Sequence, residues 1–554
     1  MKKPQQRKRV LVVGAGAAGC ACAEQLSRKK ELFDVTLVEA QDYCGGQAFS
    51  IPLDEKRYGA AWMNQGVQGG SHIYHHTFHM FKQQGVQAEP VDLEVSFGKG
   101  EHFWTNVFPT KLVEKHTKEI KRFKWVVKVM RWFEVFCSSA FLPLLFRPQL
   151  AVALLPIKIS LKMFFFSNEF IERMIYPRFA PLLSHSVITL LTDSMRSLAL
   201  FLGTGNATPD LPTIMLERMF TSPTYGMWYP VDDKSLSSNL PPMVVFPEES
   251  KFYASWQHTL ESRGVTVRLN TEVTAVISRS STGVIVTARG RRPQQDHHNP
   301  EGADQDLPEK EEMYDEVVLC VLADTAKRLL GKQARWIEKR VLGATKWSDD
   351  VTVTHNDIDY MRKWYQTDFP PDLAVDKLGD RDESARVKKG RSNFKPMYLI
   401  KNNPGDPRKV EMCFDCSNFQ YQLKEQDKPF EDHVFQTIFL NKKHEKYWSK
   451  DGINPDKIIR EDWWHQLCHS WTHYLFVVPL MAFLNRSRTR TRYAAAWTLV
   501  NAHELAIISG LAAAYSLGAE YPPELEEDAF ALLCFRLYLL LQHGRWYRKG
   551  SHRK

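Results

Sequence analysis

VLVVGAGAAG occupies residues 10–19 and joins a short apolar run directly to the spacing G-x-G-x-x-G. Residues 10–13 are short and apolar enough for a buried parallel strand, and residues 20–27 have the composition of a helix. Gly14 allows the tight turn, Gly16 allows the backbone to approach a pyrophosphate, and Gly19 allows helix and strand to pack closely. We therefore expect a dinucleotide-binding βαβ unit, with the anionic group of the ligand at the helix N-terminus.

The second strand of this unit ends in an acidic residue. The segment LVEA at residues 37–40 places Glu39 where its carboxylate can accept hydrogen bonds from both hydroxyls of an adenosine ribose. Ala18, inside the glycine fingerprint, is a further expected contact of the cofactor. A glycine-rich turn without a ligand is the alternative, but strand, glycines, helix, second strand and terminal acid together favour binding.

A second pair of glycines indicates which dinucleotide is bound. YCGGQA at residues 43–48 follows the acid, as in flavoproteins that hold FAD in an extended form, so Gly45, Gly46 and Gln47 are expected contacts. The chain here resembles the flavin-containing amine oxidoreductase superfamily, in particular a branch of NAD/FAD-binding oxidoreductases related to polyunsaturated fatty acid isomerases. The resemblance continues over residues 63–74, where Asn64 replaces the aspartate of the family.

Two later segments carry the same resemblance. GVTVRLNTEV at residues 264–273 resembles the strand whose valine backbone meets adenine in the family, which implies that contact for Val273. RYAAAWTLVNAHE at residues 492–504 contains Trp497 and resembles the start of a helix whose first N–H groups face the flavin. The resemblance therefore places His503 and Glu504 beneath the flavin, where a helix N-terminus stabilises the negative charge of its reduced form. FAD is the cofactor that these motifs imply.

The resemblance also implies the fold class. We expect an α/β protein with a Rossmann-type FAD-binding domain, an intertwined α+β substrate domain and an added apolar helical region. The FAD-binding domain is expected from residues 1–100, 241–330 and 486–525, and the substrate domain from residues 331–485. Residues 101–240 form the expected helical region that faces substrate or membrane, and residues 526–554 an apolar helix with a basic tail. Residues 177–246 look mainly helical, whereas the polar segments 289–313 and 376–393 look like surface loops.

Candidate catalytic residues lie in the glycine-rich segment 64–70 and just after it. Many glycines bring backbone close to a flat ligand, so Asn64, Gln68 and His72 are expected beside the flavin ring. Histidines also recur at helical spacing in two places, where we favour packing or a polar lining over a metal site. They are His72, His75, His76 and His79 in the first, and His465, His469 and His473 in the second, an expected helix over residues 463–474.

Cysteine usage and the N-terminus indicate the compartment. Nine cysteines are scattered and odd in number, which favours a reducing environment. Cys413 and Cys416 form C-x-x-C at the end of a strand pattern, with no second pair for zinc, so a redox or metal role is not favoured. The first apolar run after the basic N-terminus is the Rossmann strand itself, so no signal peptide is expected and the protein is predicted to be cytoplasmic.

Charge and apolar segments suggest the partners. The chain carries a formal charge of +9 but has no nucleic-acid-binding motif, so an anionic membrane surface or an anionic substrate is the expected partner. Residues 123–133 interleave basic and bulky apolar residues, and residues 141–166 are apolar but too interrupted by proline and lysine to span a bilayer. This region either dips into a membrane interface or caps a hydrophobic tunnel. Residues 528–554 repeat the pattern, and nothing in the sequence indicates the oligomeric state.

These observations predict a function. No second G-x-G-x-x-G follows a strand, which disfavours reduction by a bound nicotinamide. We expect an FAD-dependent oxidoreductase that acts on a hydrophobic, fatty-acyl substrate by hydride transfer to flavin N5, with oxidation, desaturation or double-bond isomerisation as the outcome. An amine oxidase and a flavin-binding scaffold without turnover remain as alternatives.

Overall fold

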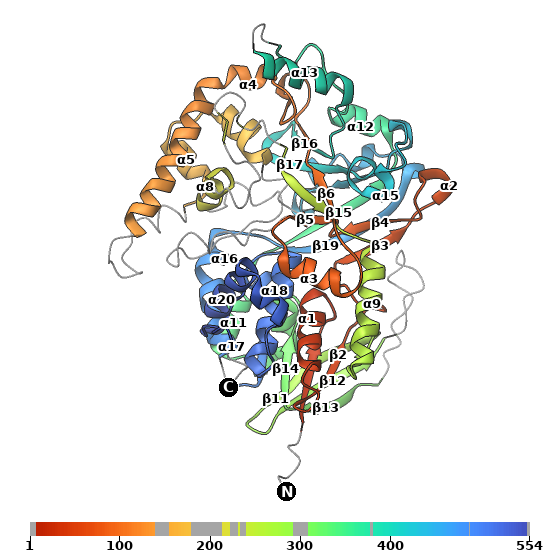
Figure 1. Ribbon diagram of the computed structural model, residues 1–554, viewed down its shortest axis with the longest axis vertical. Coiled ribbons are helices and arrows are strands. Elements are labelled where there is room, and N and C mark those ends of the chain that lie inside the picture. The colour runs from red at the N-terminus through yellow and green to blue at the C-terminus, as the bar shows by residue number, and fades with distance from the viewer. Residues whose placement is uncertain are drawn as a thin grey trace.

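A computed structural model describes residues 7–138, 155–178, 213–221, 231–232, 236, 240–291, 308–376, 380–486 and 488–550. The chain forms two main bodies, each built on a β-sheet, with a group of helices beside the upper one (Figure 1). Segments from the beginning, middle and end of the sequence meet in the lower body, so the chain crosses between the two bodies several times.

The lower body is built on a five-stranded parallel sheet. Two of its inner strands contain continuous apolar runs, at residues 10–13 and 317–319, because helices and a second sheet cover both faces of the sheet. In spatial order the strands are β10 (Thr266–Arg268), β2 (Phe33–Val38), β1 (Lys8–Val13), β14 (Glu316–Leu319) and β20 (Thr491–Tyr493). This is the Rossmann-type arrangement that the glycine fingerprint predicts.

Two buried helices cover one face of this sheet. Helix α1 (Ala17–Ser27) is buried along its whole length and packs on α18 (His503–Leu517). The two backbones approach so closely that a Cβ added at Gly510 would lie 2.1 Å from the carbonyl oxygen of Ala18. Helices α3 (His75–Gln83), α9 (Glu249–Ser262), α17 (Met481–Asn485), α19 (Pro523–Glu527) and α20 (Ala529–His543) surround this pair.

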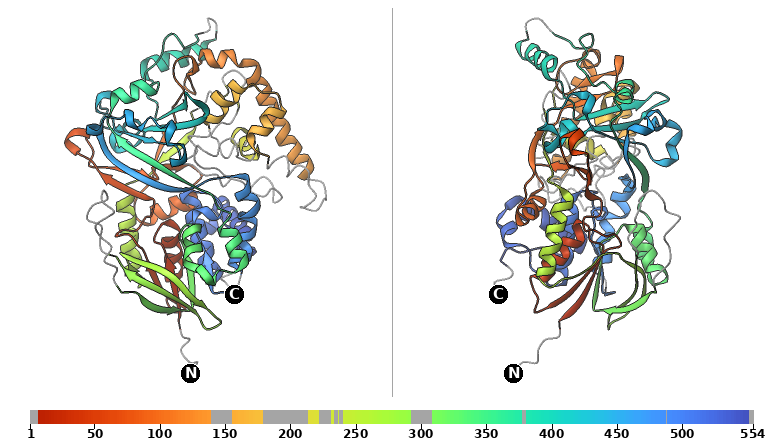
Figure 2. Two further views of the ribbon diagram at one scale, coloured as in Figure 1. Left: turned by 180° about the vertical axis from the view of Figure 1, so that it is seen from behind. Right: turned by 90° about the vertical axis from the view of Figure 1, so that its right-hand side faces the viewer.

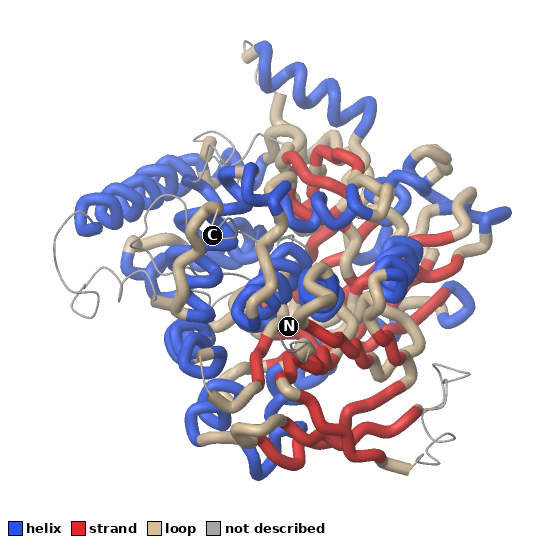
Figure 3. Tube along the Cα trace, turned by 60° about the horizontal axis from the view of Figure 1, so that its bottom comes forward, coloured by secondary structure: helices blue, strands red, loops and turns tan. Residues whose placement is uncertain are grey.

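A three-stranded antiparallel sheet belongs to the same body. It contains β11 (Thr271–Arg279), β12 (Val284–Gly290) and β13 (Lys310–Tyr314), and with α10 (Ala323–Leu330) and α11 (Trp336–Leu342) it encloses a second hydrophobic core. The view from behind shows this sheet at the lower end of the molecule (Figure 2). Seen from below, the strands run through the centre of the molecule and helices flank them (Figure 3).

The upper body is built on a mixed seven-stranded sheet. Its strands, in spatial order, are β19 (Ile458–Leu467), β15 (Trp347–His355), β18 (Phe435–Ile438), β17 (Asp406–Asp415), β16 (Tyr398–Asn403), β7 (Val95–Phe97) and β8 (Trp104–Thr105). Strand β7 shows that the chain joins this sheet before residue 100. Short helices lie around it, namely α2 (Glu55–Tyr58), α12 (Ile358–Trp364), α13 (Arg381–Asn393), α14 (Cys416–Phe419) and α15 (Tyr421–Lys424). Helix α16 (Trp471–Phe476) follows β19 and belongs to the lower body, where Nε2 of His473 lies 3.3 Å from the carbonyl of Leu499 (Figure 1).

Two small sheets link the bodies. The hairpin of β3 (Ala48–Pro52) and β4 (Trp62–Gly66) follows the second glycine pair. Strand β9 (Pro242–Val245) lies between β5 (Gly69–Ser71) and β6 (Glu89–Asp92).

The remaining helices form an arm beside the upper sheet (Figure 1). They are α4 (Lys111–Lys115), α5 (Thr117–Ser138), α7 (Ile157–Met163) and α8 (Thr213–Thr221). No helix within the described ranges combines the length and apolar character needed to cross a bilayer.

Three expected elements differ from the structure. Residues 463–467 belong to strand β19, and α16 begins only at Trp471, so the expected helix over residues 463–474 is wrong. The segment 376–393 contains helix α13, whose N-cap Asp380 accepts a hydrogen bond from the backbone of Glu383. In the expected helical segment 177–246, the structure describes α8 and strand β9, and most of the other residues lie outside the described ranges. Residues 141–154 of the expected apolar segment and residues 292–307 of the expected polar loop also lie outside these ranges.

Candidate functional site

A cavity of about 500 Å³ lies where the two bodies meet. Its lower wall comes from loops at the carboxyl ends of β1, β2 and β14, the edge at which ligands bind in open α/β sheets. Its upper wall comes from residues of β15, β17, β18 and β19 in the seven-stranded sheet. The first residues of α18 line a further side.

The three fingerprint glycines have different structural roles. Gly14 has φ +99°, and a Cβ there would lie 2.7 Å from the carbonyl oxygen of Cys320, so both conformation and space require glycine. A Cβ at Gly19 would lie 1.8 Å from the carbonyl oxygen of Gly14. A Cβ at Gly16 would meet nothing closer than 3.9 Å and would enter the cavity. The fold therefore needs Gly14 and Gly19, whereas Gly16 leaves room for a ligand.

The acid at the end of β2 lines the same cavity. One carboxylate oxygen of Glu39 accepts a hydrogen bond from the backbone N–H of Ala15 at 2.7 Å, and the other from that of Gln41 at 3.0 Å. Burial raises the pKa of Glu39, and these backbone donors oppose the rise. The two bonds fix the carboxylate and leave lone pairs that can accept from ribose hydroxyls.

The other end of the cavity is formed by the start of α18. His503 lines it and contacts two hydroxyl groups, that of Tyr253 at 2.7 Å from Nε2 and that of Thr77 at 3.1 Å from Nδ1. Burial lowers the pKa of His503 to about 4, so its imidazole is neutral at pH 7. Trp497 also lines the cavity, and a 2.9 Å hydrogen bond from its indole to the carbonyl of Val321 holds it in place.

The upper wall is mainly apolar and aromatic. Trp347, Phe414, Ile438 and Trp464 line it, and the imidazole of His465 stacks on Trp347 with ring centroids 4.9 Å apart. Within the described part of the chain, no lysine or arginine lines the cavity.

His465 carries the polar contacts of this wall. Its Nδ1 lies 2.6 Å from Asp349 and its Nε2 lies 3.0 Å from Asp324. Two carboxylates therefore flank the one histidine that the upper sheet contributes to the cavity lining.

Most of the expected cofactor contacts lie together on this cavity. The lining includes Gly14, Gly16, Ala18, Glu39, Gly45, Gly46, Gln47, Trp497 and His503. Gly19, Val273 and Glu504 are not part of it. Val273 belongs to the hydrophobic core behind the parallel sheet. Glu504 points instead to α3, where it accepts hydrogen bonds from the backbone N–H groups of His76 and Thr77.

The buried contact between Glu504 and His76 explains one of the histidine clusters. Nδ1 of His76 lies 2.6 Å from the carboxylate, and both side chains are fully buried. Burial opposes the charge of Glu504, but His76 and the backbone donors outweigh it and lower the pKa of this carboxyl. His76 and Glu504 thus hold α3 against α18. Among the described residues, no group of three histidine, cysteine or acidic side chains is placed to hold a metal ion.

The structure places all three candidate catalytic residues outside the cavity lining. The amide of Asn64 donates to the backbone carbonyls of Phe246 at 3.1 Å and Pro247 at 2.9 Å, which ties β4 to the segment before α9. Gln68 is buried in a cluster of amide side chains and accepts from Gln420 at 2.8 Å. His72 is exposed at the turn before α3. These contacts join the two bodies, and none of them faces the cavity.

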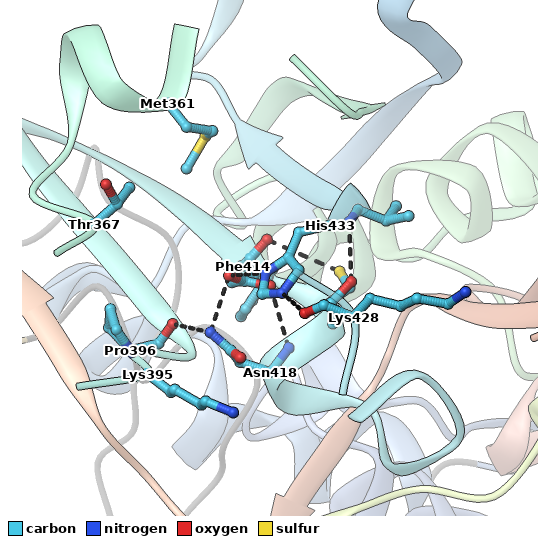
Figure 4. A network of polar contacts seen from close by, with 12 residues as sticks. Met361, Thr367, Lys395, Pro396, Phe414, Asn418, Lys428 and His433 are labelled. Carbon is cyan, nitrogen blue, oxygen red and sulfur yellow. Dashed lines mark hydrogen bonds and ion pairs between the residues drawn. The ribbon is translucent and has the colours of Figure 1, made fainter. Parts of the chain in front are cut away.

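The C-x-x-C cysteines are buried in the upper body. Burial raises the pKa of both Cys413 and Cys416, which disfavours the reactive thiolate form. Between them, Asp415 lies 2.8 Å from Nδ1 of His433 and accepts from the backbone of Asn418 at 3.2 Å. Figure 4 shows His433 and Asn418 within this network. The segment therefore anchors the end of β17.

Sequence reasoning missed the residues of the upper wall. Trp347, Phe414 and Trp464 were not among the expected contacts, and residues 458–467 were not expected as a strand. Their sequence, IIREDWWHQL, mixes charged and aromatic residues without regular alternation. Only the pairing with β15, in which Trp464 lies opposite Asp350, brings this segment to the cavity.

Comparisons with known proteins identify the fold. Residues 12–83 match the family described as NAD(P)-binding Rossmann-like domain. A cofactor-binding variant of putrescine oxidase superposes with a TM-score of 0.55 over 93% of this chain and 100% of its own, at 13% identity. A CLA-producing fatty acid isomerase from P. acnes gives 0.54 over 91% and 97%, also at 13% identity. A search of curated protein sequences found no match. At these identities the comparisons show that the fold is shared.

Proposed function

We propose that the protein is an FAD-dependent oxidoreductase that acts on a hydrophobic substrate. One observation supports this most strongly. A single cavity runs from Glu39, past two glycine segments, to an aromatic wall beside the start of α18. The first part suits an adenosine and a pyrophosphate, and the last part suits a flavin ring with a substrate against it.

The lining residues fit FAD. The open space at Gly16 and the neighbouring Gly45 and Gly46 would hold the pyrophosphate, where a larger side chain would take its place. Glu39 would accept from the ribose hydroxyls, and the N-terminal backbone of α18 would face the flavin. The fatty acid isomerase and the putrescine oxidase share this fold, which is consistent with redox chemistry but does not choose a substrate.

The side chains around the reacting end orient the ligands and exclude water. Bound FAD would supply the acceptor for a hydride from a substrate C–H bond. The first N–H groups of α18 would stabilise negative charge that develops beside them. Neutral His503, fixed by Tyr253 and Thr77, adds no positive charge at pH 7 and presents a rigid ring to the cavity.

A fatty-acyl substrate is the class we favour. Trp347, Phe414, Ile438 and Trp464 offer an apolar surface for a hydrocarbon chain, where burial of each CH₂ contributes about 0.8 kcal/mol. Within the described residues the lining contains no lysine or arginine, so recognition of the hydrocarbon chain rather than of a carboxylate would dominate. Loss of hydride to an acceptor would give oxidation or desaturation, and its return to another carbon would give isomerisation.

Amine oxidation is the second candidate because of one specific feature. Asp324 and Asp349 flank His465 beside the aromatic wall and would attract a cationic amine toward the cavity. The putrescine oxidase that shares this fold is named for an amine substrate.

An anaerobic experiment separates these outcomes. The visible spectrum of the purified protein is recorded before and after free fatty acids or aliphatic amines are added, and the lipids are then analysed by mass spectrometry. We expect fatty acids to bleach the flavin until air is admitted, or to yield a lipid of unchanged mass with oxidised flavin. Bleaching by amines alone would replace the lipid proposal with amine oxidation. A purified protein without bound flavin that also fails to bind added FAD would overturn both.

The arm of helices supports a further proposal, contact with an anionic membrane surface. Helix α5 carries six basic and two acidic residues, and its Trp125 and Trp132 are 61% and 64% exposed. Near the end of α7, Phe165 is 84% exposed. Basic side chains beside exposed aromatic rings suit the interface of a bilayer from which a hydrophobic substrate is drawn.

A further inference from the structure

A second, smaller cavity lies at the opposite end of α18 from the proposed flavin site. Its volume is about 260 Å³, and Asn485, Arg486, Arg492, Ser516, His543 and Arg545 line it. Because Ser516 follows His503 by thirteen positions, the two cavities lie roughly 20 Å apart along the helix. Asn485 belongs to α17, Ser516 to α18 and His543 to α20. Figure 1 shows these three helices side by side in the lower body.

Positive charge dominates this cavity. Three of its six lining side chains are arginines. Among the described residues, Arg486 and Arg545 form no ion pair, and Arg492 has only a long one, 3.9 Å from Glu316. Arg486 and Arg545 are exposed, whereas Arg492 is largely buried. The cavity therefore has two guanidinium groups at its mouth and one at its base.

A buried histidine without a partner lies on the same cavity. His543 is 1% exposed, and neither of its ring nitrogens has a hydrogen-bond partner in the described part of the structure. Nε of Arg492 is likewise buried and unpartnered. Buried polar atoms without partners cost free energy, so native structures rarely leave several of them around one cavity unless water or a ligand completes their bonding.

The backbone around the cavity is held in place by other contacts. The amide of Asn485 donates to the carbonyl of Gln542 at 3.1 Å and accepts from the backbone of Tyr493 at 2.9 Å. Gly544 adopts φ +61° and brings the chain against Arg486, where a Cβ would lie 2.9 Å from the arginine side chain. The arginines thus surround a site that the ends of α17 and α20 fix in advance.

We infer that this cavity binds a small oxyanion of the phosphate class, through Arg486 and Arg545 at its mouth and Arg492 and His543 at its base. Guanidinium groups match the geometry of phosphate oxygens and bind them by paired, charge-assisted hydrogen bonds. His543 would donate one further hydrogen bond from its neutral ring. The site is separate from the cavity assigned to FAD and adds a second ligand to the molecule.

A simpler explanation is that the arginines only offset helix dipoles. Helices α17, α18 and α20 all end near this cavity, and Arg545 donates to the carbonyl of Ser516 at 3.3 Å. This explanation accounts for the charge of the arginines but not for the unpartnered ring of His543. It also predicts no saturable binding of an anion, so the two explanations can be distinguished.

The test uses inorganic phosphate and the purified full-length protein at fixed ionic strength and pH 7. We expect calorimetry to detect one saturable site, and phosphate to raise Tm relative to an equal ionic strength of chloride. R545Q, on the exposed mouth, and R492K, which keeps the buried charge but loses the paired geometry, should each weaken binding at least tenfold. R548Q removes a nearby exposed arginine that does not line the cavity, and it should change the affinity less than twofold.

Two results would overturn the inference. One is the absence of saturable phosphate binding to the wild-type protein, together with an effect of R545Q on Tm but none on the response to phosphate. The other is an equal loss of affinity in R548Q and R545Q, which would indicate diffuse attraction by the basic surface.

The source of the phosphate group is resolved by comparing glycerol phosphate with vesicles that contain phosphatidic acid. Because the arm is itself expected to bind anionic vesicles, both proteins carry W125A/W132A in this comparison, and sedimentation that R545Q then abolishes would assign a lipid headgroup. Binding of the soluble ester without such sedimentation would assign a free metabolite, and either result supports the site.

Discussion

At the residue scale, Gly16 is the one fingerprint glycine that ligand binding requires although the fold does not. Because a Cβ at this position has open space around it, Gly16→Val should fold with a Tm close to that of the wild type. Its side chain would occupy the place of the pyrophosphate, so we expect FAD affinity to fall at least a hundredfold. Absorbance at 450 nm per mole of purified protein, beside a thermal melt, measures both effects.

Gly14→Ala is the matched variant for this comparison. Its φ of +99° and the 2.7 Å contact with the carbonyl of Cys320 should cost about 1–3 kcal/mol of stability. A Gly16→Val protein that retained its full complement of FAD would contradict the placement of the cofactor.

Glu39 supports a second prediction at this scale. Glu39→Gln places an amide N–H₂ where backbone N–H groups now donate, and it removes the charge that strengthens bonds to ribose hydroxyls. We expect about tenfold weaker FAD binding, in keeping with hydrogen bonds to charged groups. Fluorescence titration of the apoprotein with FAD measures the change.

The control for this variant is Glu272→Gln, which breaks a partly exposed ion pair with Arg289 in the neighbouring sheet. It should leave FAD affinity unchanged. Equal affinities of the Glu39 variant and the wild type would show that this carboxylate does not bind the cofactor.

At the element scale, one buried carboxylate joins a helix to two strands. Glu338 of α11 accepts from Arg279 of β11 at 2.7 Å and from the hydroxyl of Tyr493 of β20 at 2.9 Å. Burial alone would raise the pKa of Glu338, but Arg279 and the backbone of Arg335 outweigh it and lower the pKa from 4.5 to about 2. The ionised form is thus stabilised in the folded protein.

This shift gives stability a defined pH dependence. Because the folded pKa is the lower one, the contribution of Glu338 is fully present above pH 4.5 and is lost as the pH falls toward 2. It amounts to about 3 kcal/mol. Urea unfolding of Glu338→Gln should show lower stability at pH 7 and a flatter decline between pH 4.5 and 2. A decline as steep as in the wild type would assign the acid sensitivity to other groups.

Comparison of elements also shows why sequence predicted one wall of the cavity and not the other. Residues 10–19, 37–48 and 492–504 each bring their ligand contacts within one short segment, so a local pattern is sufficient. The upper wall is assembled by pairing of β15 with β19, more than a hundred residues apart, and no local signal marks Trp347 or Trp464 as neighbours. Long-range antiparallel pairing is visible only in the folded chain.

Polar composition misled the prediction of α13 in a different way. Residues 381–393 contain few apolar residues, so no stripe with a helical period marks the segment. The signal that was present is the N-cap, in which Asp380 accepts from the backbone of Glu383. Asn64 and Gln68 show a related limit at the site, because the glycine-rich segment reaches the cavity at Gly66 and Val67 while these two polar side chains bond to protein groups instead.

At the scale of the whole molecule, the arm of helices predicts how the protein meets a bilayer. Trp125 and Trp132 of α5 are exposed beside basic residues, whereas the exposed Trp336 lies on α11 in the lower body. We expect wild-type protein to sediment with vesicles that contain anionic lipid, less so at high salt because screening weakens the attraction. W125A/W132A should reduce the partition coefficient at least tenfold, since two aromatic rings no longer enter the interface.

W336A removes a tryptophan that is even more exposed, at 77%, and should bind vesicles as the wild type does. An equal loss in W336A, or no sedimentation of the wild type, would remove the membrane from the proposal. The apolar wall of the main cavity would then still accept a hydrophobic substrate, but that substrate would have to reach it from solution or from a carrier. The spectrum of the flavin with dispersed fatty acids would remain the test of turnover, because it does not depend on the arm.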